Sequence, residues 1–319
     1  AASGGKDFNP LELLQSPFGG GAASLNEGIA GFYDESSGLW EQVWGEHMHH
    51  GYYPGGRDRS DHRQAQVDMI ERALEWAGVD SAESVLDVGC GIGGSSRHMA
   101  RKFGCAATGI TLSPVQAERA QELSDAAGLE GLDFLVADAL DQPFGDETFD
   151  FVWSMESGEH MPDKRKFLSE LARVTEPGGR ILVVTWCHRN LAASEAALPP
   201  DEQFLLDRIC DAYYLPAWCS VNDYEAIAGE LGLEGVRTAD WSTEVQPFWR
   251  AVIDTALTPE GFLGLLQAGP KTLAGALVMP GMQLGLARGT IKFNLLTATK
   301  PAAGGEAGAG EPAASGEAN

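Results

Sequence analysis

Hydrophobic and polar positions alternate along the middle of the chain in a way that predicts short buried strands separated by helices. Five apolar runs have the length and composition of strands in a parallel sheet: 84–89, 106–110, 132–137, 149–154 and 180–186. Two weaker runs, near 235–240 and 291–299, predict two more strands. Strands that alternate with helices at this spacing predict an α/β fold with a doubly wound, seven-stranded and mostly parallel sheet.

Helix signals fill the gaps between these runs. Residues 95–103 ("SSRHMARKF") predict one helix, and residues 221–232 ("VNDYEAIAGELG") predict another. A third helix is expected to begin at Pro114, because Pro favours the first helical position and Ser113 before it is a good N-cap. The "PGG" at 177–179 predicts the turn before the fifth strand.

The segments outside the sheet divide the chain into a flap, a core and a cap. Residues 1–24 and 302–319 are rich in Gly, Ala and Ser and predict loose tails around one folded domain at 25–301. Segments that follow late strands are expected to cover the edge of the sheet where open α/β folds bind ligands. We place an N-terminal flap at 25–66, a ligand-binding core at 67–187 and an α-helical cap at 188–218 and 242–290.

Charge and cysteine usage exclude several classes of partner. Acidic residues outnumber basic ones 46 to 22, and the formal net charge of −24 argues against a nucleic-acid partner. Five separated cysteines without a CxxC pair predict reduced thiols in a chain that is not secreted. No apolar run reaches the ~18 to 20 residues needed to span a bilayer, so the sequence predicts a soluble chain and leaves peripheral contact with a membrane open.

The glycine-rich stretch "LDVGCGIGG" (86–94) predicts a loop that wraps a ligand between the first strand and the next helix. A nicotinamide enzyme would need an acidic residue about 20 positions later, where this chain has "ITLS" (110–113). Asp87 directly precedes the first glycine and could accept from a ligand ammonium, whereas it would repel a pyrophosphate. The loop therefore indicates a nucleotide-like ligand other than NAD.

Two further strand ends carry polar residues at the same edge. Asp138 follows the third strand and is placed to accept from an adenine amine, although it could also act as a helix N-cap. The fourth strand ends in Ser154, Met155 and Glu156, which we expect to line the same cleft.

The stretch "GEHMHHGYYP" (45–54) holds His47, His49 and His50 and raises the question of a metal site. Adjacent positions rarely point at one ion, and the sequence offers no matching Cys/His/Asp cluster. We therefore expect no metal, and interpret the stretch as part of the flap over the ligand.

These motifs resemble those of class I S-adenosylmethionine-dependent methyltransferases: Asp-x-Gly-x-Gly after the first strand, "ADA" (137–139) after the third and "PGG" before the fifth. Longer stretches are similar to the plastid γ-tocopherol C-methyltransferases, from about residue 25 to 301. They are "FYDESSGLWEQVWGEHMHHGYY" (32–53), "GITLSPVQAERA" (109–120), "SMESGEHMPDKRKFL" (154–168), "VTWCHR" (184–189) and "ALVMPGMQLGLARGTIKFNLLTATKP" (276–301).

The resemblance implies S-adenosyl-L-methionine as the cofactor and assigns residues to it. The loop residues Asp87, Gly89, Cys90, Gly91 and Gly93 would hold its methionine end, with Tyr33 and the "MHHG" segment closing over that end. The ribose would meet Thr111, Leu112 and Gln116, and the adenine would meet Asp138 and Ala139. Ser154, Met155 and Glu156 would complete the cofactor cleft.

The resemblance also implies methylation of γ- or δ-tocopherol at the ring carbon ortho to the phenol, giving α- or β-tocopherol, in plastids. Removal of the phenolic proton activates that carbon, and histidine is a suitable base. The candidates for the base are His160 and His49, with Glu159 beside the first. His50, Trp44, Trp186 and His188 are expected to contact the substrate. The apolar segment 255–289 is expected to surround the isoprenoid tail or to touch lipid, unless it only packs the cap on the sheet.

Two other functions remain open at this point. Plant alkaloid N-methyltransferases share many of the same stretches, and an amine acceptor needs no base of this kind. A catalytically silent cofactor-binding protein is the alternative of another class, and the intact Asp87 loop speaks against it.

Overall fold

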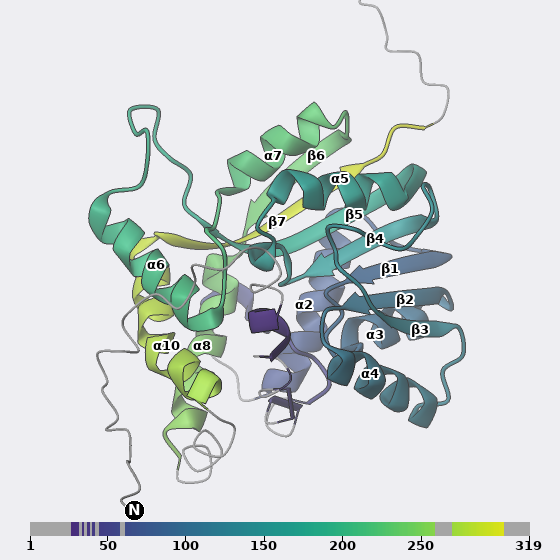
Figure 1. Cartoon of the computed structure of the whole chain (residues 1–319), viewed down its shortest axis with the longest axis horizontal. Helices are drawn as coiled ribbons and strands as arrows, with labels where there is room; N and C mark the ends of the chain where they lie inside the picture. Colours follow the sequence, from purple (N-terminus) through teal and green to yellow (C-terminus); the bar gives the residue numbers. More distant parts are fainter. Residues whose placement is uncertain are drawn as a thin grey trace, which may run out of the picture.

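A seven-stranded sheet in the order β3-β2-β1-β4-β5-β7-β6 runs through the protein (Figure 1). The computed structural model describes residues 27–31, 34, 37–38, 40–41, 45–57, 61–258 and 270–302. The strands are β1 (Ser84–Val88), β2 (Ala106–Thr111), β3 (Leu132–Val136), β4 (Phe149–Met155), β5 (Thr175–His188), β6 (Glu234–Asp240) and β7 (Ile291–Thr299). β7 pairs antiparallel with β5 and β6, whereas β1 to β5 pair in parallel. The predicted doubly wound, mostly parallel sheet is confirmed.

Helices cover both faces of the sheet because successive strand residues point to opposite sides. In β5, Leu182 and Val184 belong to one buried cluster, while Ile181 and Val183 belong to the other. The first cluster includes residues of α2 (His62–Ala77) and α3 (Gly94–Phe103), and the second includes residues of α5 (Lys164–Val174) and α7 (Val221–Glu230). α4 (Pro114–Ala126) packs along β2 and β3.

Three helices gather on one side of the sheet and form the cap. They are α6 (Pro200–Tyr213), α8 (Ser242–Ala256) and α10 (Pro270–Arg288), drawn together at the lower left of Figure 1. α10 packs against both α6 and α8. Two short 3-10 helices, η2 (Pro54–Gly56) and η3 (Gly158–His160), lie beside the cap and beside β5.

Most predicted element boundaries agree with the structure to within two residues. The hydroxyl of Ser113 accepts from the backbone N–H of Gln116 at 3.0 Å, which confirms the predicted cap and start of α4. The prediction that "PGG" is a turn before the fifth strand is wrong, because β5 already begins at Thr175. The register shifts between Phe149 and Phe151 of β4, so the extra residues form an irregularity inside β5. Gly178, with φ of 83°, allows that distortion.

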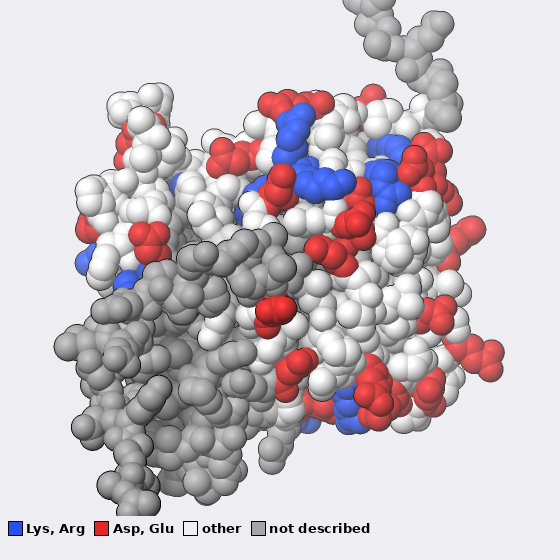
Figure 2. All heavy atoms as spheres, viewed as in Figure 1, with Lys and Arg blue, Asp and Glu red and all other residues white. Residues whose placement is uncertain are grey.

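Acidic side chains are scattered over the face shown in Figure 2, and the basic side chains near α5 and α7 lie beside acidic ones. Arg165 of α5, for example, pairs with Glu230 of α7. Within the described part of the chain, no helix is long and apolar enough to cross a membrane.

Candidate functional site

A cavity opens at the edge of the sheet where β1, β2, β3 and β4 end. Its walls include thirteen of the residues that the sequence assigned to the site. They are His49, Asp87, Gly89, Cys90, Gly91, Thr111, Leu112, Gln116, Asp138, Ala139, Met155, Glu156 and His160. Parallel strands bring their carboxyl ends to one edge, so Asp87 and Glu156, about 70 positions apart in sequence, meet here.

The glycine loop after β1 forms the floor of the cavity. The backbone N–H groups of Gly89 and Cys90 donate to the carbonyl of Ile110 at 2.9 and 3.0 Å, which ties the loop to the end of β2. Gly89 has φ of 82°, and a Cβ at this position would lie 2.7 Å from the hydroxyl of Ser157. A Cβ on Gly94 would press on the carbonyl of Glu46 in the flap. Only glycine therefore fits between the strand end on one side and the flap on the other.

Asp87 places a buried carboxyl group in the cavity wall. Its Oδ2 accepts from the hydroxyl of Ser96 at 2.6 Å, and the residue is 1% exposed. Burial raises the pKa of Asp87 to about 7, although the Ser96 bond and the charge of Arg97 act in the opposite direction. A ligand ammonium beside this carboxylate would provide the positive charge that stabilises its ionised form.

Thr111 and Gln116 form a second wall that is tied to the flap. Thr111 donates to the side-chain oxygen of Gln116 at 2.8 Å, and the Gln116 amide donates to Ser37 at 3.0 Å. Ser113 donates to Asp34 at 2.5 Å. The predicted ribose-binding residues thus also hold the N-terminal segment against α4.

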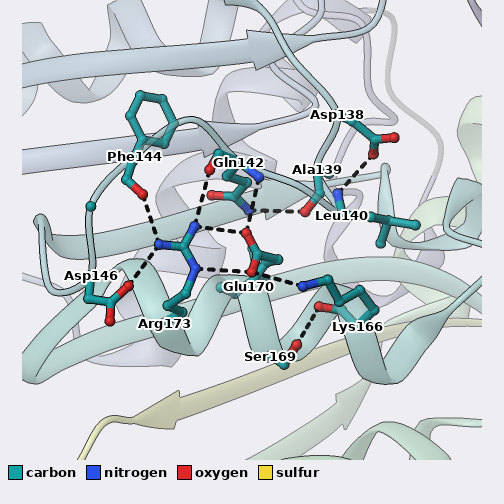
Figure 3. Close-up of polar contacts among 12 residues, drawn as sticks. Asp138, Ala139, Leu140, Gln142, Phe144, Asp146, Lys166, Ser169, Glu170 and Arg173 are labelled. Carbon is teal, nitrogen blue, oxygen red and sulfur yellow. Dashed lines mark hydrogen bonds and ion pairs between the residues drawn. The ribbon is translucent and has the colours of Figure 1, made fainter.

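The loop that carries Asp138 and Ala139 is held from behind by α5 (Figure 3). Glu170 accepts from the backbone of Gln142 at 3.0 Å and from Arg173 at 2.8 Å, while Arg173 also donates to the carbonyl of Phe144 at 2.8 Å. The bond from Arg173 is the main reason that the pKa of Glu170 is lowered to about 2. Asp138 accepts from the N–H of Leu140 at 2.8 Å, so it closes its own turn at the cavity edge.

The flap crosses the cavity and is fixed by side chains of α2 and α3. The amide of Gln66 donates to the carbonyls of His47 and His49 at 2.8 Å each. Arg97, which is 1% exposed, bonds Glu46 at 2.9 Å. These contacts place His49 in the cavity wall, and its Nδ1 lies 2.9 Å from the carbonyl of His50. A carbonyl only accepts, so Nδ1 carries the hydrogen and Nε2 presents a lone pair.

His50 and Glu156 join the flap to the end of β4. Glu156 accepts from the backbone N–H of His50 and from its Nδ1, at 2.6 Å each, and from the indole of Trp186 at 3.3 Å. Burial opposes the ionisation of Glu156, but the charge and hydrogen bonds of His50 outweigh it and lower its pKa. Glu156 has φ of 52°, a left-handed conformation that costs a non-glycine residue about 1–3 kcal/mol and is typical of functional positions.

Glu159 and His160 follow in η3 and differ in position. His160 lines the cavity, and burial lowers its pKa to about 3. Glu159 is buried behind the wall, where it accepts from Thr185 at 2.8 Å. Burial and the charge of Glu156 raise its pKa to about 8, so it is mostly protonated at pH 7.

Several predicted residues lie away from the cavity wall. Ser154 is fully buried and bonds Ser157 at 2.6 Å, and Gly93 lies at the start of α3, where it precedes the wall residue Gly94. His188 lines a separate hollow of about 520 Å³ under α6. Tyr33 and Trp44 lie outside the described residues.

Sequence reasoning missed three residues that build the site. They are Gln66, Arg97 and Ser157, which are ordinary helix or loop positions by pattern, and their contacts join segments far apart in the chain. The buried polar side chains of Gln66 and Arg97 on otherwise apolar helix faces were the available signal. Among the described residues, no group of three possible metal ligands lies together.

Comparisons with known proteins match this chain to methyltransferases. A family described as "Methyltransferase domain" matches residues 86–183. A probable tocopherol O-methyltransferase, chloroplastic, of Oryza sativa subsp. japonica is 62% identical over 87% of this chain and 79% of its own length. The tocopherol O-methyltransferase, chloroplastic, of Arabidopsis thaliana is 56% identical over 87% and 83%. A norajmaline N-methyltransferase of Rauvolfia serpentina is 36% identical over 87% and 99%.

Proposed function

The chain belongs to the tocopherol methyltransferases, and on that premise we propose that it transfers a methyl group from S-adenosylmethionine to a ring carbon of γ-tocopherol. The acceptor is the carbon ortho to the phenol, and δ-tocopherol is a second substrate of the same kind, so the products are α- and β-tocopherol. The observation that carries this proposal is the identity of 62% and 56% to these two relatives across 87% of this chain. Both relatives are chloroplastic, so we place this chain in the plastid as well.

The cavity fits S-adenosylmethionine by the chemistry of its walls. Asp87 is a buried carboxyl group whose ionised form would be stabilised by the ammonium of the methionine part. The glycine loop leaves no room for side chains, which suits close approach of a ligand to the backbone. Thr111, Gln116 and Asp138 provide hydroxyl, amide and carboxyl groups for the ribose and the adenine.

When bound, S-adenosylmethionine supplies a methyl group that its sulfonium already makes electrophilic. The residues of this chain then need to orient the acceptor and exclude water. The flap serves both tasks, because His47 and His49 are held over the cavity by Gln66. Glu156 and Met155 lie at the end of β4 and line the same cavity as His160, where they would border the methyl group of the bound cofactor.

The two relatives are named O-methyltransferases, and the choice between oxygen and carbon follows from the chemistry of a phenol. Removal of the phenolic proton spreads negative charge over the oxygen and the ortho carbon. A protonated histidine beside the oxygen donates a hydrogen bond to it. The oxygen is then less available for methylation, and the ring carbon acts as the nucleophile. His49 and His160 both line the cavity, as the prediction of either as the base requires.

We further propose that the cap touches lipid, which is the source of a lipophilic substrate. α10 has no charged residue from Thr272 to Ala287, yet Leu277 is 70% exposed and Leu284 is 44% exposed. Phe204 of α6, which packs beside α10, is 66% exposed. Apolar side chains exposed together on a helix pair favour an interfacial contact.

The test is an incubation of the protein with labelled S-adenosylmethionine and γ-tocopherol, δ-tocopherol or an indole alkaloid amine. We expect label in both tocopherols, in products that co-elute with α- and β-tocopherol and keep a free phenol. Label only in the amine would show that the protein is an N-methyltransferase instead. Label in a phenol methyl ether would show that the phenolic oxygen, and not the ring carbon, accepts the methyl group.

A further inference from the structure

Two buried polar atoms without partners lie in neighbouring rings behind the cavity wall. The rings of His50 and Trp249 are 4.8 Å apart between centroids. Within the described part of the chain, neither Nε2 of His50 nor Nε1 of Trp249 has a hydrogen-bond partner, although both atoms are buried. They are two of twelve buried side-chain atoms that lack a partner among the described residues, and as an acceptor and a donor in adjacent rings they can serve a ligand group that both donates and accepts.

The other ring nitrogen of His50 fixes the form of the imidazole. Nδ1 lies 2.6 Å from Oε2 of Glu156, and an ionised carboxylate only accepts hydrogen bonds. Nδ1 therefore carries the hydrogen, and Nε2 presents a lone pair. When Nε2 takes up a proton, the same carboxylate stabilises the imidazolium that forms.

Aromatic rings enclose this imidazole and define what we name the aromatic box: Trp186, Phe248, Trp249 and Phe293 around His50. The ring centroids of Trp186 and Phe248 lie 5.2 and 4.9 Å from that of His50, and Phe293 lies at 6.4 Å. These rings pack against the imidazole itself, so a phenol ring can stack among them only after one of them moves away. Glu156 borders both the box and the cofactor cavity, so the two sites adjoin.

We propose that the aromatic box binds the phenol ring of the substrate, with His50 as the general base and Glu156 as its positioning residue. This inference rests on the proposed function and names the residues that carry out its proton transfer. Two walls of the box, Phe248 and Trp249, come from the cap helix α8, so the cap must move for the ring to enter.

Each proton and electron pair in the step has a place. The phenolic proton passes to Nε2 of His50, and the O–H bonding pair stays on the oxygen, which accepts from the indole N–H of Trp249. The ortho carbon forms the bond to the methyl group, and the pair of the broken S–CH3 bond stays on sulfur. The hydrogen on the methylated carbon then leaves to solvent as a proton, and His50 returns its proton to the phenolic oxygen.

The neighbouring histidines are less suited to this role. Burial lowers the pKa of His49, and it lowers the pKa of His160 to about 3, so both rings resist protonation. Nδ1 of His49 meets a neutral carbonyl at 2.9 Å, which does not stabilise an imidazolium as a carboxylate does. A base needs a partner that stabilises its charged form, and Glu156 gives His50 an ion pair at 2.6 Å.

The charged and titratable groups around His50 are few. Glu156 at the end of β4 is its ion-pair partner, and His49 precedes it in the flap. Glu159 and His160 of η3 act on the pair through Glu156. The groups that β5, α8 and β7 bring to the box are the uncharged rings of Trp186, Phe248, Trp249 and Phe293.

The experiment measures kcat and KM for γ-tocopherol against pH in the wild type, His50→Gln, Glu156→Gln and Trp249→Phe, together with affinity for S-adenosylhomocysteine. We expect His50→Gln to lower kcat by roughly 10² to 10⁴-fold at pH 7 with unchanged cofactor affinity. Its rate should rise about tenfold per pH unit toward pH 10, where the phenol ionises without a base. Glu156→Gln should lower kcat more than it raises KM and shift the pH profile, and Trp249→Phe, which removes the donor to the phenolate oxygen, should mainly lower kcat.

His98→Gln is the matched control, because His98 also bonds a carboxylate, Glu71, at 2.6 Å, but on the outer surface of α3. It should leave the profile unchanged. A His50→Gln variant within threefold of wild-type kcat, or one whose rate does not rise with pH, overturns the inference. The inference is also overturned if His50→Gln keeps the pH profile of the wild type while His49→Gln or His160→Gln loses its pH-dependent limb. A wild type that methylates neither tocopherol refutes the proposed function instead.

Discussion

Gly94 lies at the start of α3 against the flap, so we expect Gly94→Ala to disturb the closure of the flap more than the stability of the core. The residue is helical, so Ala should stabilise α3 by up to about 1 kcal/mol. The new Cβ, however, would press on the carbonyl of Glu46 and lie 2.7 Å from Nδ1 of His47. Ordinary contact begins at 3.4 Å, and the Glu46 carbonyl lies closer to the new Cβ than this Nδ1 does, so the flap must withdraw by more than 0.7 Å at this point.

A shift of that size at the cavity wall should be costly for turnover and neutral for folding. A misplacement of about 1 Å near reacting groups lowers rates by roughly 10²-fold, so we expect Gly94→Ala to lose about 10- to 100-fold in turnover. Its melting temperature should stay within a few degrees of the wild type.

The assay combines tocopherol methylation, S-adenosylhomocysteine binding and a thermal melt. Gly229→Ala is the matched control, because a Cβ there meets nothing within 4 Å in α7, and it should keep full turnover. The reasoning is refuted if Gly94→Ala keeps turnover and cofactor affinity within twofold of the wild type.

Three other predictions concern charge and the cap. Affinity for S-adenosylhomocysteine should fall as the pH drops below about 7, where Asp87 becomes protonated, and calorimetry of Asp87→Asn should show weak binding without this dependence. Arg173→Met should lower the free energy of unfolding, measured with urea at pH 7, by roughly 1–3 kcal/mol. The pKa of Glu170 is lowered to about 2 in the folded state, so the stability that its carboxylate contributes is present above the pKa it has in the unfolded chain and is lost as the pH falls. The difference in unfolding free energy between Arg173→Met and the wild type should therefore be smaller at pH 3.5. A double Leu277→Ser, Leu284→Ser variant should lose binding to neutral lipid vesicles but keep turnover on detergent-dispersed tocopherol; equal vesicle binding would contradict the lipid contact.

The strands and the cofactor loop could be predicted because their information is local. Val85 and Leu86 face opposite clusters, as the alternation of a buried strand requires, and Ser113 with Pro114 marks the start of α4 by side-chain chemistry alone. The error at 177–179 has the same origin. Gly178 signals a turn by local preference, but Thr175 and Arg180 on either side pair with β4, and Gly178 and Gly179 bond the backbone of Lys300, so the strand continues through it.

The candidate site could be predicted only as a set of strand ends, because its pairings depend on tertiary contacts. The edge that gathers Asp87, Thr111, Asp138 and Glu156 follows from parallel topology. Which histidine meets which carboxylate does not follow from spacing, since His50 and Glu156 are 106 positions apart. The sequence therefore favoured His160 beside Glu159, whereas the structure places that carboxyl group behind the wall against Thr185.

The flap is fixed at three separate points by three kinds of contact. Arg97 holds Glu46 by charge, Gln66 holds the backbone of His47 and His49, and Glu156 holds His50. The first two partners belong to α2 and α3, while the third lies at the cavity itself. Substitution of Arg97 or Gln66 should therefore change how the cofactor is enclosed, whereas substitution of Glu156 should also change the proton chemistry. That difference between enclosure and chemistry separates residues that only close the site from those that act on the phenol.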